Sequence, residues 1–108
     1  MNLAAIDIGT NSVKLLVGRV AGRRVSPVLH RTIITRLGEG LQKTGAISLE
    51  AADRTIAALA ELKSLAEERG AERLQAVGTL ALRAATNGQD IIDRVQKELG
   101  LPIRILTG

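Results

Sequence analysis

The sequence predicts an α/β fold: a five-stranded mixed sheet with strand order 3-2-1-4-5 and helices packed on the sheet. Apolar runs over residues 3–6 and 13–20 and a stretch rich in β-branched residues over 23–35 are joined by short turns, which predicts antiparallel neighbours with strand 2 reversed. Two helical patterns then alternate with two short apolar runs, so that right-handed crossovers make strands 4 and 5 parallel to strand 1. Pro27 interrupts the third run and cannot donate to a ladder, which predicts an edge position for that strand.

Two helices are predicted from their caps and apolar stripes. The first begins at Ser48, a favourable N-cap residue, and ends at Arg69-Gly70. Its apolar stripe consists of Leu49, Ala52, Ile56, Leu59, Leu62, Leu65 and Ala66. The second helix is predicted over residues 88–99, with Asn87 as its cap and Gly100 as its end.

Composition restricts the core and the classes of partner. Hydrophobic residues make up 45% of the 108 residues and none is aromatic, so the core has to be aliphatic. The chain has no cysteine, no signal-peptide pattern, and no apolar run near the roughly 18 residues that span a bilayer. These absences predict a cytoplasmic protein that has no membrane partner. The net charge of +4 favours anionic partners, but nucleic acid is not expected because base-stacking aromatic side chains are lacking. The residues expected to point inward are Leu3, Ile6, Val13, Leu15, Ile56, Leu59, Leu74, Val77, Ile91, Val95 and Ile105.

Small polar residues between the first two strands indicate a phosphate site. Asp7 ends the first strand, where its carboxylate can reach a metal ion or orient a water molecule. Gly9 permits close approach of the backbone to a ligand, and successive N–H groups as far as Asn11 can form an anion-binding concavity. Thr10 and Ser12 add hydroxyl donors. The plain alternative is a hairpin turn that merely requires Gly, Asn and Ser.

Two further strand ends are expected beside this turn. Short strands are predicted over residues 73–77 and 103–106, and they end at Gly78-Thr79 and Thr107-Gly108. Ligands of such sheets bind outside the carboxyl ends of the parallel strands. Three stretches of small polar residues are therefore expected to meet at the edge that carries Asp7.

The remaining polar residues favour ordinary surface roles. Residues 36–41 are predicted to form a loop, in which Glu39 is a plain loop charge or, less favoured, a carboxylate of the site. His30 has no partner near it in sequence and is expected to be structural. Arg23 and Arg24 belong to a basic hairpin whose charges discourage aggregation at the sheet edge.

Three stretches together resemble a known family. They are Asp7-Ile8-Gly9-Thr10-Asn11-Ser12, Arg36-Leu37-Gly38-Glu39-Gly40-Leu41, and the spacing Thr79, Ala81, Arg83, Ala85, Asn87 around a short helical turn predicted over 80–84. With a ribonuclease H-like sheet, they resemble the actin-like ATPase and sugar-kinase superfamily. More narrowly, they resemble the amino-terminal part of the exopolyphosphatase and guanosine pentaphosphate phosphohydrolase family. The resemblance extends over essentially the whole chain and implies that residues 1–108 are one subdomain of a two-lobed phosphatase, excised from a longer chain.

The resemblance implies hydrolysis of terminal phosphate from polyphosphate or guanosine pentaphosphate with a divalent metal, magnesium being the expected ion. Asp7 would be the catalytic residue that holds metal or water. The phosphate ligands implied are Gly9, Thr10, Asn11, Ser12, Arg83 and Asn87. Arginine suits phosphate because its planar fork binds bidentately, although an exposed helix charge is the plain alternative for Arg83. Thr10 stands where the family more often has serine, and the hydroxyl is kept.

The resemblance also implies that residues 1–108 lack part of the machinery. In the family, the glutamate that activates water follows in an acidic loop just after the position of Gly108, and a second lobe closes over the substrate. The chain alone is therefore expected to be inactive. Its expected partner is the second lobe of the same protein, and the full-length protein can form a homodimer in this interpretation. Two alternatives stay open: a lobe of an actin-like ATPase or kinase, and a non-catalytic module that binds phosphate-rich ligands through Arg23 and Arg24. The sequence does not rank polyphosphate against guanosine pentaphosphate.

Overall fold

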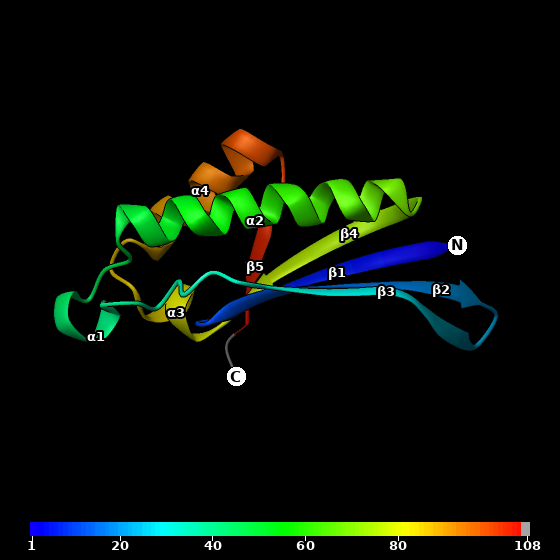
Figure 1. Ribbon diagram of the computed structural model, residues 1–108, viewed down its shortest axis with the longest axis horizontal. Helices are drawn as coiled ribbons and strands as arrows, with labels where there is room; N and C mark the ends of the chain where they lie inside the picture. The colour runs from blue at the N-terminus through cyan, green and yellow to red at the C-terminus, as the bar shows by residue number, and fades with distance from the viewer. Residues whose placement is uncertain (107–108) are drawn as a thin grey trace.

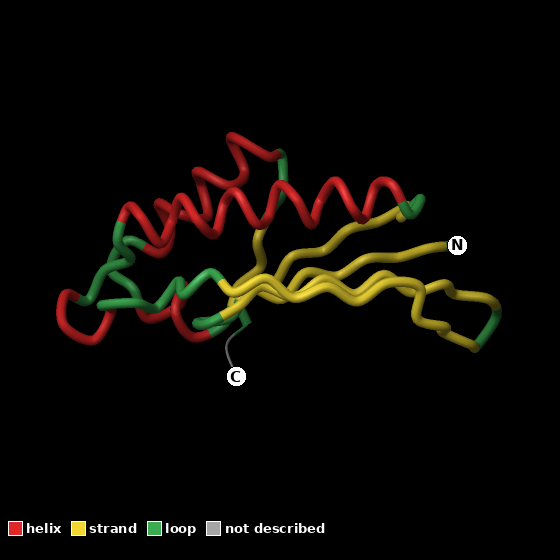
Figure 2. Tube along the Cα trace, in the orientation of Figure 1, coloured by secondary structure: helices red, strands yellow, loops and turns green. Residues whose placement is uncertain are grey.

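A five-stranded sheet forms one layer of the structure, and its two long helices lie together over one face (Figure 1). The computed structural model describes residues 1–106. The strands are β1 (Asn2–Ile8), β2 (Ser12–Ala21), β3 (Arg24–Ile34), β4 (Ala71–Gly78) and β5 (Ile103–Ile105). The helices are α1 (Leu41–Thr44), α2 (Leu49–Glu68), α3 (Leu80–Ala84) and α4 (Gly88–Leu99). Figure 2 shows the strands as a continuous layer, with the helical segments above it and at one end.

The predicted sheet is confirmed in order and direction. The strands are arranged β3-β2-β1-β4-β5, in which β2 is antiparallel to β1 and β3, whereas β4 is parallel to β1 and β5. This is the ribonuclease H-like α/β arrangement. The parallel strands β1, β4 and β5 therefore end at the same edge of the sheet. Thr107-Gly108, which were expected at this edge, lie outside the described residues.

The edge position of β3 is also confirmed, and it accommodates Pro27. The register of β2 and β3 shifts between Val17 and Gly18, which places Gly18 opposite Pro27. Proline is tolerated at an edge strand and at a bulge because neither position requires its missing N–H.

The core is aliphatic and lies between the sheet and the helices. Alternate residues of β1 and β2 point toward the helices and are buried: Ala4, Ile6, Ile8, Val13, Leu15 and Val17. Leu59 and Leu62 of α2 and Val95 of α4 are fully buried against them. The opposite face of the sheet carries no helix in the described chain, and Leu16 is 48% exposed there.

Four local predictions were wrong or incomplete. Leu3 and Val77 were expected to point inward, but both are only partly buried because strand alternation places them on the uncovered face. Leu49, the first residue of α2, is 72% exposed, whereas Ala51 and Ala52 of the same turn are buried. Residues 41–44 form the single helical turn α1, which is too short to show a periodic pattern.

The caps of the two long helices differ from one another. The Ser48 hydroxyl accepts a hydrogen bond of 3.1 Å from the N–H of Ala51, which confirms Ser48 as the N-cap of α2. Asn87 occupies the N-cap position of α4, but its side chain makes no capping bond to the helix. Among the described residues, no helix is both long enough and apolar enough to cross a membrane.

Candidate phosphate-binding site

A tight turn connects β1 to β2 at the edge where the parallel strands end. The N–H of Gly9 donates to the carbonyl oxygen of Ser12 at 3.0 Å and closes the turn. Thr10 and Asn11 are exposed at its tip. No backbone acceptor in the described chain takes the N–H of Thr10 or Asn11, so these two groups are the outward donors of the turn. The predicted concavity therefore rests on Thr10 and Asn11, since the N–H of Gly9 is used within the turn.

The loop after β3 docks onto the carbonyl groups of this turn. The N–H groups of Thr35 and Arg36 both donate to the carbonyl oxygen of Asn11, at 3.0 and 2.9 Å. The N–H of Gly38 donates to the carbonyl oxygen of Thr10 at 3.0 Å. A Cβ on Gly38 would lie 2.3 Å from Thr10 Cγ2, so with any other residue here the exposed Thr10 side chain would have to rotate to keep this approach. We call residues 35–38 the docking segment; its role was not predicted from the sequence.

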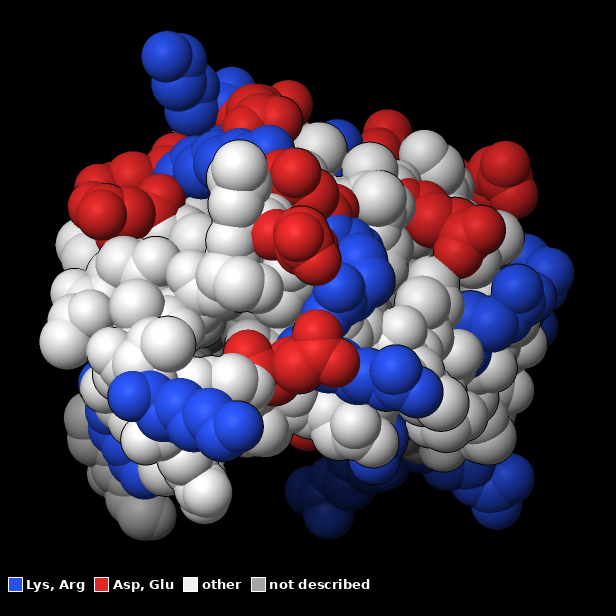
Figure 3. Space-filling model, turned by 60° about the vertical axis from the view of Figure 1, so that its left-hand side comes forward, with Lys and Arg blue, Asp and Glu red and all other residues white. Residues whose placement is uncertain are grey.

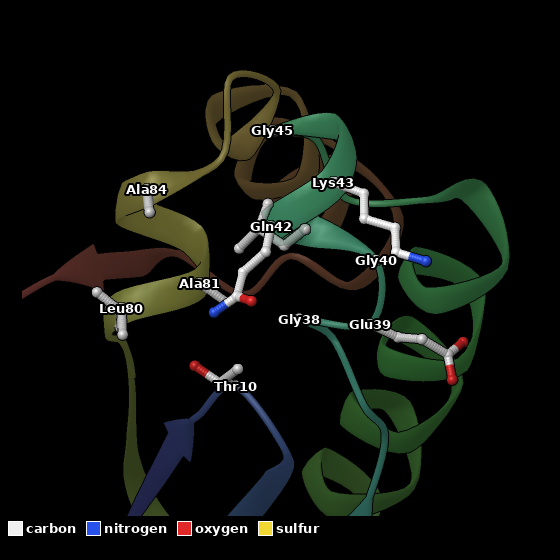
Figure 4. Close-up of a pocket in the computed structure, with 11 residues that line it drawn as sticks. Thr10, Gly38, Glu39, Gly40, Gln42, Lys43, Gly45, Leu80, Ala81 and Ala84 are labelled. Atoms are coloured by element: carbon white, nitrogen blue, oxygen red, sulfur yellow. The ribbon is translucent and has the colours of Figure 1, made fainter.

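An open cleft of about 720 Å³ lies beside Thr10 (Figure 4). It is lined by Thr10, Gly38, Glu39, Gly40, Leu41, Gln42, Lys43, Gly45, Leu80, Ala81 and Ala84. The turn after β1 forms one wall, and α1 and α3 form the others. Figure 4 shows the Gln42 amide directed toward the Thr10 side chain and the Lys43 ammonium directed away from it. Gln42 was missed in the sequence because α1 was predicted as loop.

Charge is unevenly distributed around this end of the molecule. Figure 3 shows that acidic side chains gather over the upper, helical part of this face, whereas Lys and Arg predominate in its lower part. Glu39 pairs with Arg54 at 3.3 Å, which supports the interpretation of Glu39 as a loop charge. The lining of the cleft carries one acidic and one basic side chain, Glu39 and Lys43.

Asp7 lies on the uncovered face of the sheet and does not line the cleft. It is exposed in β1 and its Cα is paired with that of Lys14 on β2. Among residues 1–106, no three or more His, Cys, Asp or Glu side chains are grouped as a metal cage. Magnesium needs no such cage, because it commonly binds one or two carboxylates together with waters and substrate phosphates. A single exposed carboxylate at the strand ends is therefore compatible with magnesium.

The segment after β4 carries Thr79 and Arg83. The N–H and the hydroxyl of Thr79 both lie 3.3 Å from the carbonyl oxygen of Ile8, which ties the ends of β4 and β1 together. Arg83 is exposed, and its Nη1 donates to the carbonyl oxygen of Leu106 at 3.0 Å. This bond turns the guanidinium toward the end of β5 and leaves its other N–H donors available. Arg83 thus lies at the predicted edge, although outside the lining of the cleft.

Asn87 lies apart from the turn. Its side-chain amide is bonded to the backbone of Ile47, ahead of α2. The structure therefore brings Thr10 together with the docking segment and with Leu80, Ala81 and Ala84 of α3. Asp7, Asn87 and the α3 residue Arg83 lie outside the lining of this cleft. Contact of these residues with phosphate stays a prediction.

The basic hairpin and His30 lie elsewhere. Figure 1 shows the β2–β3 turn, which contains Arg23, at the opposite end of the strands from the turn after β1. His30 is exposed on the uncovered face, opposite Leu16. Neither the hairpin nor His30 lines the cleft. The basic hairpin is therefore spatially separate from the candidate site.

The fold and the site together define a structural class. A mixed sheet of order 3-2-1-4-5, with a tight Gly-Thr turn after β1 and a helical turn after β4 beside one cleft, is a ribonuclease H-like α/β fold. Comparison with known proteins then narrows the class. The Ppx/GppA phosphatase family matches residues 16–108, and the chain belongs to this family.

Relatives and solved structures agree with this assignment. Exopolyphosphatase 1 of Mycobacterium leprae is 33% identical over all of this chain. A guanosine-5'-triphosphate,3'-diphosphate pyrophosphatase of Vibrio cholerae is 35% identical over 97% of it. The crystal structure of the Aquifex aeolicus family member superposes with a TM-score of 0.95 at 37% identity over 99% of the chain. The chain spans 32%, 21% and 35% of the lengths of these three proteins, respectively.

Proposed function

We propose that residues 1–108 act as the phosphate-binding lobe of an exopolyphosphatase or guanosine pentaphosphate phosphohydrolase, which hydrolyses terminal phosphoanhydride bonds. The observation that carries the proposal is the docking segment. Its three hydrogen bonds occupy the carbonyl groups of Thr10 and Asn11. An anion is repelled by exposed carbonyl oxygens and attracted by N–H groups, so this arrangement suits the turn to phosphate.

The proposed roles follow from position. The N–H groups of Thr10 and Asn11 and the Thr10 hydroxyl would bind phosphate oxygens, while Gly9 and Ser12 close the turn that presents them. Arg83, on α3, would add a bidentate contact beside the end of β5. Asp7 would orient water or hold a divalent cation, for which we propose magnesium. When bound, such an ion neutralises charge on the phosphate oxygens.

The remaining parts of the active site would come from outside this lobe. Phosphoryl transfer depends on positioning and on charge neutralisation from several sides of the phosphate. The cleft beside Thr10 is open, and the relatives that match this chain are about three to five times its length. We therefore propose that a second lobe supplies the opposing phosphate contacts and the general base. The cytoplasmic location and the homodimer stay predictions.

A substrate panel tests the proposal. The full-length protein, with the length that its relatives have, would be incubated with Mg²⁺ and with long-chain polyphosphate, guanosine pentaphosphate or ATP, and phosphate release would be measured. Release from either of the first two substrates, with little from ATP, is the expected result. Hydrolysis confined to ATP would replace the proposal by an actin-like ATPase, and binding without turnover of any of the three would indicate a non-catalytic module.

A further inference from the structure

Arg54 reaches from α2 to the loop that holds the candidate phosphate turn. Its Nε donates to the carbonyl oxygen of Thr35 at 2.9 Å, and its Nη2 donates to the carbonyl oxygen of Arg36 at 3.4 Å. The same Nη2 pairs with Glu39 Oε1 at 3.3 Å. One guanidinium therefore contacts the loop at three points while its own Cα is fixed in a long helix that packs on the sheet.

These contacts surround an unusual backbone conformation. Arg36 has φ of 52°, the only positive φ of a residue other than glycine in the described chain. A residue with a Cβ rarely adopts this conformation unless its surroundings enforce it. The carbonyl groups of Thr35 and Arg36 belong to the two peptides on either side of Arg36, so Arg54 holds both peptides that define the bend.

The bend in turn determines where the docking segment meets the phosphate turn. Immediately before it, the N–H groups of Thr35 and Arg36 converge on the carbonyl oxygen of Asn11. Two residues after it, Gly38 donates to the carbonyl oxygen of Thr10. In a trans peptide the carbonyl and the N–H point in opposite directions. Because Gly38 holds the Thr10 carbonyl, the N–H of Asn11 in the same peptide is directed away from the docking segment.

The contact to Thr35 cannot be replaced readily by water. Thr35 is 1% exposed, so its carbonyl group would lose its charged partner in a protected environment if Arg54 were removed. A buried carbonyl without a partner is costly, and the loop would rearrange to satisfy it. The rearrangement would release the carbonyl groups of Thr10 and Asn11 from the docking segment.

We propose that Arg54 is a positioning residue for the phosphate turn. It contacts no phosphate itself, but it fixes the bend at Arg36 and through it the orientation of the Asn11 N–H. The inference rests on the proposed function of the turn. Glu39 assists by restraining the Arg54 guanidinium through their ion pair.

The chain offers a matched control for Arg54. Arg94 on α4 likewise joins separate segments through its guanidinium, pairing with Asp53 and Glu98, and its side chain is 34% exposed against 40% for Arg54. Hydrogen bonds to Glu98 and Asp53 raise the pKa of Arg94 above its ordinary value. Arg94→Gln therefore removes two ion pairs, one more than Arg54→Gln removes, without touching the loop.

The experiment compares Arg54→Gln, Arg54→Lys and Arg94→Gln in residues 1–108. Backbone amide NMR shifts are recorded without ligand, and tripolyphosphate is then titrated. Arg54→Gln should move the Asn11 amide resonance in the free chain and weaken tripolyphosphate binding by about tenfold, the loss expected for one charge-assisted hydrogen bond. Arg54→Lys should restore part of the affinity, because it keeps the charge but not the fork. Arg94→Gln should leave both quantities within about twofold of the unmodified chain, a change below the worth of one hydrogen bond.

The outcomes separate the two proposals. If Arg54→Gln leaves both the Asn11 amide shift and the affinity for tripolyphosphate unchanged, the inference about Arg54 is overturned. The proposed function is not affected by that result, provided that the chain without substitutions binds tripolyphosphate. If the unmodified chain does not bind tripolyphosphate, the proposed function loses its support, and the Asn11 shift in the free chain alone decides the role of Arg54. If Arg54→Gln does not fold, Arg54→Lys decides by the same two readouts, with Glu39→Gln expected to show a smaller change in the same direction.

Discussion

The side-chain amide of Asn87 is bonded to both backbone polar groups of Ile47. The N–H of Ile47 donates to Asn87 Oδ1 at 2.8 Å, and Asn87 Nδ2 donates to the carbonyl oxygen of Ile47 at 2.9 Å. The two residues are 40 positions apart in the chain. The pair therefore joins the segment before α2 to the start of α4. A phosphate group could bind the Asn87 side chain only in addition to, or in place of, these two hydrogen bonds.

Asn87→Ala should lower the free energy of unfolding by about 1–3 kcal/mol, because it leaves two partly buried backbone groups of Ile47 without partners. Urea unfolding of residues 1–108 measures this change. Gln89→Ala, which removes an exposed hydrogen bond to Asp93, is the control and should cost much less. A loss of phosphate affinity in Asn87→Ala without loss of stability would show instead that Asn87 acts on the ligand.

Gly38→Ala should force the exposed Thr10 side chain to rotate, because the added methyl group would lie 2.3 Å from Thr10 Cγ2. We expect a stability cost at the low end for overpacked positions, about 1 kcal/mol, together with weaker phosphate binding because the Thr10 hydroxyl moves. Gly70→Ala is the matched control. Gly70 has φ of 68° at the end of α2, far along the chain from the site, so its substitution should cost about 1–2 kcal/mol and leave phosphate affinity unchanged. Equal affinities for the two variants would remove Gly38 from the site.

Asp7→Asn in the full-length protein should reduce turnover at least about a hundredfold and leave the melting temperature nearly unchanged. Asp7 is exposed, and among the described residues it has no ion-pair partner within 4.0 Å, so the fold does not depend on its charge. Phosphate release at several Mg²⁺ concentrations is the measurement. Glu61→Gln, on the exposed side of α2, is the control. Near-normal turnover of Asp7→Asn would exclude Asp7 from the mechanism.

Arg83→Lys should raise the KM for polyphosphate about tenfold with a smaller effect on kcat, since an ammonium group cannot reproduce the bidentate fork. The loss would include the bond that Arg83 donates to Leu106. Steady-state kinetics of the full-length protein measure both constants. Arg104→Lys makes the same chemical change at an exposed position of β5 and should leave both constants unaltered. Unchanged kinetics for Arg83→Lys would favour the alternative of an exposed helix charge.

Residues 1–108 alone should fold but should not hydrolyse polyphosphate or guanosine pentaphosphate at a meaningful rate. Loss of a general base typically costs about 10²–10⁴ in rate, and loss of the opposing phosphate contacts adds to this. A phosphate-release assay with Mg²⁺, run beside the full-length protein, checks the expectation. Turnover within about tenfold of the full-length protein, less than the loss of a base alone, would contradict the two-lobed proposal.

The parts of the fold that follow local rules were predictable from the sequence. Pro27 placed β3 at the edge, and the strand and helix patterns then led to the observed order. The docking segment could not be predicted, because the bonds from Thr35, Arg36 and Gly38 join residues more than 20 positions apart and use only backbone groups. Such bonds leave no periodic signal.

The helix ends show the same limit. Ser48 and Asn87 are both favoured N-cap residues, yet only Ser48 bonds its own helix. The Asn87 side chain turns to Ile47 because the incoming chain before α2 presents an N–H and a carbonyl group there. A sequence pattern identifies a residue that can cap, whereas the tertiary structure decides which backbone groups it bonds.

The aliphatic core also determines how the site can be observed. Because residues 1–108 contain no tryptophan, tyrosine or phenylalanine, the chain has no intrinsic aromatic fluorescence. Leu80 lines the cleft and is 56% exposed, so Leu80→Trp would introduce a lone fluorophore beside Thr10 without opening the core. A change in its emission on addition of phosphate would report binding at the cleft, without signal from any other aromatic residue of residues 1–108.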